Sequence, residues 1–195
     1  MNKLLHQEGG RSNPRRRVLG TLALLLLALA GLTMTQTSMG EPIRAALGQL
    51  SPAPRIGNRM LDFTLPDTGG RAVSTSQLSG KVVIINFWAT WCPPCRQEMP
   101  ALQQVYDQHR EHGLVLLGVD YGEDRETVVN FAHEIGVSFP LLLDRDTAVG
   151  QRYRFQGLPT SVFVDRQGII RDMVAGGPMS VSYIEDKIAP LLAEK

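Results

Sequence analysis

The segment FWATWCPPCRQEMP, residues 87–100, contains both cysteines of the 195-residue chain and joins two kinds of secondary structure. It overlaps the end of KVVIINFW (81–88), an apolar run rich in β-branched residues, which is typical of a strand buried on both faces. Four side chains then recur at helical spacing before Gly113, namely Met99, Leu102, Val105 and Tyr106. The cysteines therefore lie where a buried strand passes into a helix.

The rest of the chain from residue 57 predicts alternating strands and helices. Further strands are expected at residues 114–120, 139–144, 160–165 and 169–175, and further helices at 124–135, 147–153 and 180–192. The turn at Gln167-Gly168 makes the last two strands antiparallel, whereas the earlier crossovers favour parallel neighbours. Upstream, MLDFTL and RAVS flank the turn residues 66–70 and predict a β-hairpin. We expect an α/β domain over residues 57–195, with a central mixed β-sheet flanked by helices.

The N-terminal 56 residues have a different composition. Residues 1–17 carry a net charge of +4 in a chain whose total is +1, so the remaining residues carry −3. The run from Val18 is apolar, and no charge appears before Glu41. This pattern predicts a cytoplasmic basic segment (1–17) and a transmembrane signal-anchor (18–38), followed by a linker (39–56). The small residues around Leu29 leave open a cleaved signal peptide. The slightly acidic remainder argues against nucleic-acid binding.

The two cysteines allow several interpretations. A disulfide between residues this close removes little chain entropy, so it is a poor structural staple. A zinc site needs about four ligands, a haem-attachment motif needs His where Arg96 stands, and a peroxidatic cysteine usually has Thr or Ser where Ala89 stands. Redox chemistry fits best, because Cys92 begins a helix. Free backbone N–H groups and the helix dipole there stabilise a thiolate, and Cys95 would be shielded one turn further on.

The motif NFWATWCPPC, together with GLPTSVFVDRQG at 157–168, resembles the thioredoxin superfamily. Within it, the chain is most similar to the membrane-anchored, extracytoplasmic ResA/TlpA/CcmG-like group over about residues 57–195. This resemblance implies a thioredoxin fold with an added N-terminal hairpin. It also implies a thiol-disulfide oxidoreductase that works through a Cys92–Cys95 disulfide, with no cofactor and no metal.

The same resemblance assigns roles to individual residues. Cys92 matches the nucleophile and Cys95 the resolving cysteine. Pro159 matches the cis-proline beside the disulfide, Leu158 presents backbone groups to a substrate, and Thr160 follows as in the family. Three more residues complete the expected substrate-binding surface: Trp91, Pro93 and Pro94.

A departure from ordinary thioredoxins suggests a further catalytic residue. Thioredoxins carry a buried Asp before Phe-Trp-Ala, whereas this chain has Asn86, which cannot titrate. ResA-like proteins also have Asn there and place a Glu near the cysteines from the loop after the next strand. Glu123 stands at that place, and a carboxylate beside two thiols can exchange protons near neutral pH. The alternative is a solvated loop carboxylate.

The resemblance implies a monomeric dithiol reductant on the outer face of the bacterial cytoplasmic membrane. Its partners would be a protein disulfide, such as the CxxCH cysteines of apocytochrome c, and a membrane thiol-disulfide electron donor. Two other functions remain open at this point. One is a disulfide-forming oxidase, and the other is a thiol chaperone for metal or haem assembly.

Overall fold

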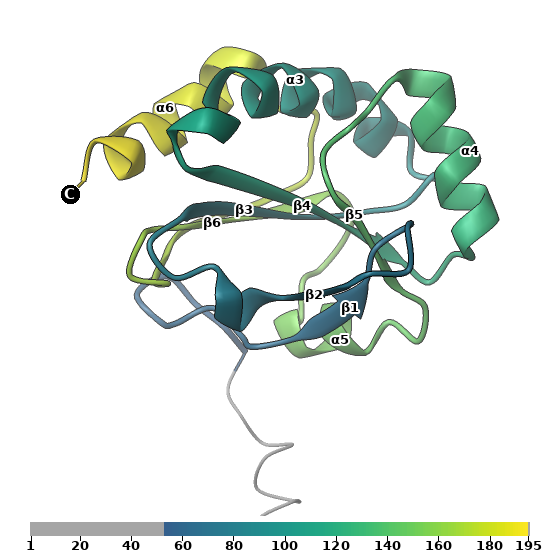
Figure 1. Ribbon diagram of the computed structural model, residues 1–195, viewed down its shortest axis with the longest axis horizontal. Coiled ribbons are helices and arrows are strands. Elements are labelled where there is room, and N and C mark those ends of the chain that lie inside the picture. Colours follow the sequence, from purple (N-terminus) through teal and green to yellow (C-terminus); the bar gives the residue numbers. More distant parts are fainter. Residues whose placement is uncertain (1–52, 195) are drawn as a thin grey trace, which may run out of the picture. The chain divides into compact units, whose positions relative to one another are not determined.

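The computed structural model describes residues 53–194, which form most of a compact unit from Ala53 to Lys195 (Figure 1). The basic segment 1–17, the predicted transmembrane segment 18–38 and most of the predicted linker 39–56 lie outside the described residues. Within residues 53–194, no helix is long and apolar enough to cross a membrane.

A five-stranded mixed sheet forms the centre of this unit, in the order β5-β4-β3-β6-β7. The bounds of the strands are β3 Val82–Trp88, β4 Leu114–Tyr121, β5 Leu141–Asp144, β6 Thr160–Val164 and β7 Ile170–Ala175. Strands β3, β4 and β5 pair in parallel, while β6 is antiparallel to both β3 and β7. All seven residues of β3 are buried, as a central strand covered on both faces requires. The predicted α/β class and mixed sheet are confirmed.

Helices and a hairpin cover the two faces of the sheet. One face carries α3 (Pro93–His109), α4 (Arg125–Ile135) and α6 (Val181–Ala193), as Figure 1 shows. The other carries α5 (Ala148–Tyr153) and the hairpin of β1 (Thr64–Pro66) and β2 (Ala72–Ser74), which pair antiparallel. Successive side chains of β3 alternate between these layers, because side chains of a strand point to opposite faces.

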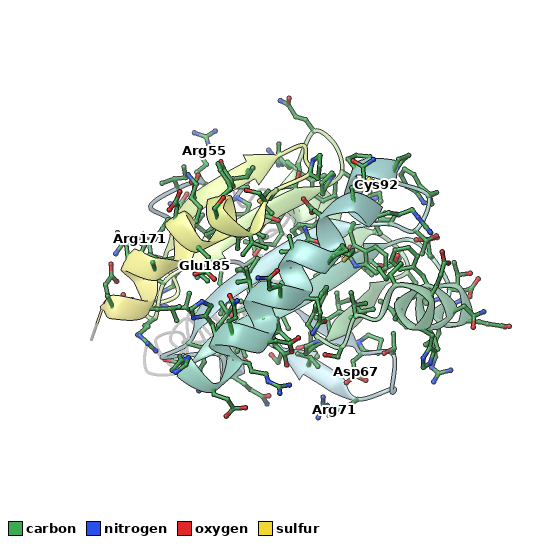
Figure 2. All side chains as sticks on the ribbon, turned by 90° about the horizontal axis from the view of Figure 1, so that it is seen from above. Arg55, Asp67, Arg71, Cys92, Arg171 and Glu185 are labelled. Atoms are coloured by element: carbon green, nitrogen blue, oxygen red, sulfur yellow. A yellow bond between two sulfur atoms is a disulfide. The ribbon has the colours of Figure 1, made fainter. Side chains whose placement is uncertain are left out.

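The element boundaries differ slightly from those predicted. The hairpin strands are only three residues long, and α3 ends at His109, followed by a 3-10 turn at Arg110–His112. His109, the last residue of α3, lies against α6, with its Nε2 2.9 Å from Glu185 Oε1. Figure 2 labels Glu185 on α6. The amphipathic pattern of the sequence predicts which face of α3 is buried. It does not show which element packs beside the edge of that face.

Gly118, in the middle of β4, is a point where the core admits no side chain. A Cβ there would lie 2.7 Å from Leu141 Cδ2 and 2.9 Å from Phe139 Cε2. We expect Gly118→Ala to lower the free energy of unfolding by about 1–3 kcal/mol, because the surrounding core must shift to accept the methyl group. Gly157→Ala is the control, since a Cβ at Gly157 meets nothing within 4 Å. Urea denaturation of both variants tests this, and equal midpoints would contradict it.

Candidate active site

The cysteine pair lies at the N-terminal end of α3, as Figure 2 shows for Cys92. Cys92 is the N-cap of this helix, and Pro93 and Pro94 fill its first two positions, where no backbone N–H is needed. The two sulfurs form a disulfide of 2.08 Å, and the backbone N–H of Cys95 lies 3.4 Å from Cys92 Sγ. On reduction, the helix end would therefore stabilise a thiolate on Cys92 rather than on Cys95.

A second segment, far away in the sequence, lines the same groove as Cys92. The Leu158–Pro159 peptide bond is cis, and Pro159 leads directly into β6, which pairs with β3. An open groove of about 500 Å³ separates the segment before Pro159 from the cysteine loop. Its lining residues are Trp91, Cys92, Pro93, Pro94, Tyr121, Phe155, Gln156, Gly157 and Leu158. Cys92 lines this groove and is 3% exposed, whereas Cys95 does not line it and has no exposed surface.

The structure brings together most of the residues predicted for substrate binding. Trp91, Pro93, Pro94 and Leu158 all line this groove, and the side chain of Trp91 is 65% exposed. Thr160 does not line it. Its hydroxyl donates to the carbonyl oxygen of Gly157 at 2.7 Å, so this side chain shapes the loop before β6.

Trp88, a second tryptophan near the cysteines, belongs to the core. It has no exposed surface, and its ring packs against Phe131 of α4 with centroids 5.0 Å apart. The two tryptophans, three residues apart, therefore have separate roles. One supports the sheet, and the other, Trp91, forms part of the groove.

Glu123 lies beside the loop that precedes the cysteines. Its Oε2 accepts a hydrogen bond from the backbone N–H of Thr90, and its Oε1 accepts one from the Thr90 hydroxyl, both at 2.6 Å. The contact shows that Glu123 reaches the loop between β3 and α3. Its proposed exchange of protons with Cys95 stays a prediction.

A buried carboxyl group that the sequence analysis missed lies within the site. Glu98 has no exposed surface, and its Oε1 accepts a hydrogen bond from Asn86 Nδ2 at 2.7 Å. Its Oε2 lies 3.3 Å from the backbone nitrogen of Met179. Burial raises the pKa of Glu98 from 4.5 to about 7, even though both contacts favour the ionised form.

Glu98 lies close both to the cysteine pair and to the segment that contains Pro159. It follows Cys95 by three residues, which places the two side chains on the same face of α3. A Cβ on Gly177 would lie 2.8 Å from Glu98 Oε2 and 2.9 Å from Pro159 Cγ, so this carboxyl group and the cis-proline meet at Gly177. The signal in the sequence was available, because Glu98 falls on the same helical face as Leu102.

Asp120 forms a second buried carboxyl group at the end of β4. It is fully buried, and its Oδ1 accepts a hydrogen bond from the backbone N–H of Glu123 at 2.9 Å. Burial, together with the neighbouring Glu123 and Asp144 carboxylates, raises the pKa of Asp120 to about 8.

In the described part of the chain, no three His, Cys, Asp or Glu side chains are grouped so as to hold a metal ion.

Comparisons with known proteins identify the family. The AhpC/TSA family profile matches residues 56–173. The thiol-disulfide oxidoreductase ResA of Geobacillus thermodenitrificans is 34% identical over 155 residues, which is 80% of this chain and 84% of that protein. A thiol:disulfide interchange protein of the thioredoxin family from Chlorobium tepidum superposes with a TM-score of 0.63 at 27% identity, over 73% of this chain and 98% of that one.

A secreted Mycobacterium tuberculosis disulfide oxidoreductase homologous to DsbE is also similar, with a TM-score of 0.60 and 27% identity over 66% of this chain and 96% of that one. The fold and the cysteine pair thus define a thioredoxin-like thiol-disulfide oxidoreductase. The chain belongs to the AhpC/TSA family of the thioredoxin superfamily.

Proposed function

We propose that this protein is a dithiol reductant of protein disulfides, with Cys92 as nucleophile and Cys95 as resolving cysteine. The observation that supports this most directly is the position of Cys92, which caps a helix and borders a groove that Cys95 does not line. Cys92, although only 3% exposed, is thus the cysteine that a second protein in the groove can reach, and Cys95 is held beside it.

The reaction exchanges disulfides without a cofactor. The Cys92 thiolate attacks one sulfur of the substrate disulfide, and the other sulfur leaves as a thiolate that takes up a proton. The Cys95 thiol then loses its proton and attacks Cys92 Sγ, which releases the second substrate thiol. The enzyme is left with the Cys92–Cys95 disulfide seen in the structure. A membrane thiol-disulfide donor returns two electrons in the reverse exchange.

The second step needs a proton acceptor near Cys95, and two carboxyl groups are candidates. We assign this role to Glu98, because it is buried on the same face of α3 and its pKa of about 7 allows it to gain and lose a proton at neutral pH. Glu123, the residue predicted from the sequence, is the second candidate. Single-turnover rates of Glu98→Gln and Glu123→Gln against pH would distinguish them, since only the acceptor's variant should lose the wild-type profile.

The groove suggests how a protein substrate is held. Its walls combine the exposed ring of Trp91 with three apolar side chains, those of Tyr121, Phe155 and Leu158. Cis-proline segments of this superfamily present backbone groups to an extended peptide, and we propose that Leu158 does so here. The groove therefore suits a short extended segment that carries its cysteine next to an apolar side chain.

Trp91→Ala should weaken the use of a peptide disulfide. We expect kcat/KM for a cysteine-pair peptide to fall about tenfold, because truncating an exposed aromatic residue of a binding surface commonly costs more than 1 kcal/mol. Tyr183→Ala is the control, since Tyr183 is an exposed aromatic side chain on α6, outside the groove. Equal losses in both variants would show that the groove does not bind the peptide.

The substrate and the membrane attachment extend the proposal. We propose that residues 18–38 tether the domain to the bacterial cytoplasmic membrane, with residues 57–195 on its outer face. We further propose that apocytochrome c, through its CxxCH cysteines, is a substrate. The similarity to proteins named ResA and to a secreted disulfide oxidoreductase supports this reading.

Covalent trapping is the experiment that tests the proposal. A Cys95→Ser variant expressed in cells should accumulate mixed disulfides between Cys92 and its substrates, which mass spectrometry can identify. Reductant function also requires a reduction potential low enough to reduce the trapped partners. A potential well above those of the trapped disulfides would instead indicate an oxidase.

A further inference from the structure

A contact that the proposed reaction does not use lies two residues before Cys92. Glu123 accepts both the backbone N–H and the hydroxyl of Thr90, each at 2.6 Å. Hydrogen bonds to an ionised acceptor are roughly twice as strong as neutral ones. Thr90 lies in the short link between β3 and α3, so this pair of bonds fixes the link from a neighbouring loop.

The link is a tight turn whose shape determines the direction of Trp91 and Cys92. The backbone N–H of Cys92 donates to the carbonyl oxygen of Ala89 at 3.2 Å, which leaves Thr90 and Trp91 in the middle of the turn. Trp91 is 65% exposed, so packing of its ring contributes little to holding it. Among the described residues, the two hydrogen bonds from Thr90 to Glu123 are the ones that connect the middle of this turn to a distant part of the chain.

Asp120 holds Glu123 through a hydrogen bond to its backbone. It is fully buried, its Oδ1 accepts the backbone N–H of Glu123 at 2.9 Å, and its Oδ2 is buried without a hydrogen-bond partner among the described residues. A buried carboxyl oxygen without a hydrogen-bond partner disfavours the ionised form. Burial and the neighbouring Glu123 and Asp144 carboxylates raise the pKa of Asp120 to about 8, so at neutral pH Asp120 is mostly protonated.

We propose that Asp120 and Glu123 form a carboxyl pair that positions the Ala89–Cys92 turn for thiol-disulfide exchange. Glu123 is a positioning residue that acts through Thr90, and Asp120 acts through Glu123. The inference rests on the proposed function, because it concerns the presentation of Cys92. When Asp120 loses its proton, the Glu123 and Asp144 carboxylates face a third negative charge, and the hold on Thr90 weakens.

The first test uses the oxidised full-length protein, in which no thiol titrates. Trp88 is the β-sheet partner of Asp120, and Trp91 follows Thr90, so tryptophan emission reports on both ends of the contact. Between about pH 6 and 9.5, below the tyrosine titration, we expect a transition with a midpoint near 8, in addition to those of histidine and of Glu98, whose pKa is about 7. Asp120→Asn should abolish it, because the amide oxygen can still accept the Glu123 backbone N–H but the amide cannot titrate. A flat wild-type curve, or an unchanged transition in Asp120→Asn, would overturn the role of Asp120.

The second test measures alkylation of Cys92 in the reduced full-length protein. Thr90→Val removes the hydroxyl contact without changing any charge, and we expect the rate at pH 7 to fall about tenfold, since a misplaced reacting group loses this much or more. Thr90→Ser keeps both hydrogen bonds and should stay within about twofold of wild type. Equal rates in the two variants would refute the positioning role.

A second pair of variants covers the case in which Thr90→Val does not fold. The amide of Glu123→Gln can accept the Thr90 N–H and donate to the Thr90 hydroxyl, whereas Glu123→Ala can do neither. Both remove the same charge, so an expected rate ratio of about ten isolates the positioning effect. An unreactive Cys92 in the wild-type protein would refute the proposed function. A reactive wild type with a ratio near one would refute this inference alone.

Discussion

Replacing Cys92 by serine is expected to abolish disulfide reduction, with a fall in rate on the order of 1,000-fold or more. The thiolate is the nucleophile of disulfide exchange, and a serine hydroxyl is not ionised at neutral pH. The helix end that would stabilise a Cys92 thiolate cannot compensate, because a serine at an N-cap is itself a favoured neutral residue. Reduction of insulin or of a cysteine-pair peptide by the pre-reduced protein measures the effect.

Cys95→Ser is the matched variant for this prediction. It keeps the nucleophile and removes the resolving thiol, so the first exchange should proceed and stop at a mixed disulfide. Non-reducing electrophoresis should show this adduct for Cys95→Ser and none for Cys92→Ser. The reverse pattern would exchange the roles of the two cysteines, and adducts from both variants would show that α3 does not distinguish them.

Glu98→Gln should produce two opposite effects, slower catalysis and higher stability at alkaline pH. Loss of a positioned proton acceptor typically costs a factor of about 100 or more, so we expect the reduction rate at pH 7 to fall about a hundredfold. The stability effect follows from the pKa of Glu98, which burial raises from 4.5 to about 7. Between these two values the folded protein holds a proton that the unfolded chain has released.

The sign of the pH effect follows from that difference. The native state binds more protons than the unfolded state, so the contribution of Glu98 to the free energy of unfolding falls as pH rises from about 4.5 to 7. Above pH 7 the native state bears the full cost of a buried carboxylate, about 3 kcal/mol for a shift of this size. Glutamine carries no charge and avoids this cost.

Urea denaturation of the disulfide-linked protein at two pH values tests the stability effect. At pH 8, Glu98→Gln should exceed wild type by up to about 3 kcal/mol, and at pH 4.5 the two should nearly agree. Asp120 also titrates with a raised pKa, but it is present in both proteins and cancels in the difference. A variant less stable than wild type at pH 8 would show that Glu98 is stabilised as the carboxylate.

The sequence predicted the fold well because its strongest signals are local. The apolar run Val82–Trp88 predicts a strand that is covered on both faces, and every residue of it is buried in the structure. The turn at Gln167-Gly168 fixed the antiparallel pairing of β6 with β7, which the register shows. Short elements were less clear. The hairpin strands have three residues each, and propensity alone cannot define the ends of elements that are so short.

The sequence predicted the site less completely, because burial and charge depend on contacts distant in the chain. Glu98 lies on the apolar face of α3, yet a glutamate in a helix is usually solvated, and only the approach of Gly177 and Met179 from the loop before α6 encloses it. In the sequence, Asp120 follows an apolar run, so it resembles the first residue of a loop. Its burial depends on the packing of neighbouring elements around the end of β4, which no local pattern reveals.

The unequal access to the two sulfurs has a consequence for the order of events in turnover. Only Cys92 lines the groove, and Cys95 is sealed beneath it. An incoming thiolate must therefore attack Cys92 Sγ, whether it comes from an electron donor or from a product running the exchange backwards. Donor and substrate cannot be engaged at the same time, since both need the same sulfur and the same wall of the groove. With Cys92 as the proposed nucleophile, we expect the protein to release one partner before it binds the next, in a double-displacement cycle rather than in a complex of two proteins bound at once.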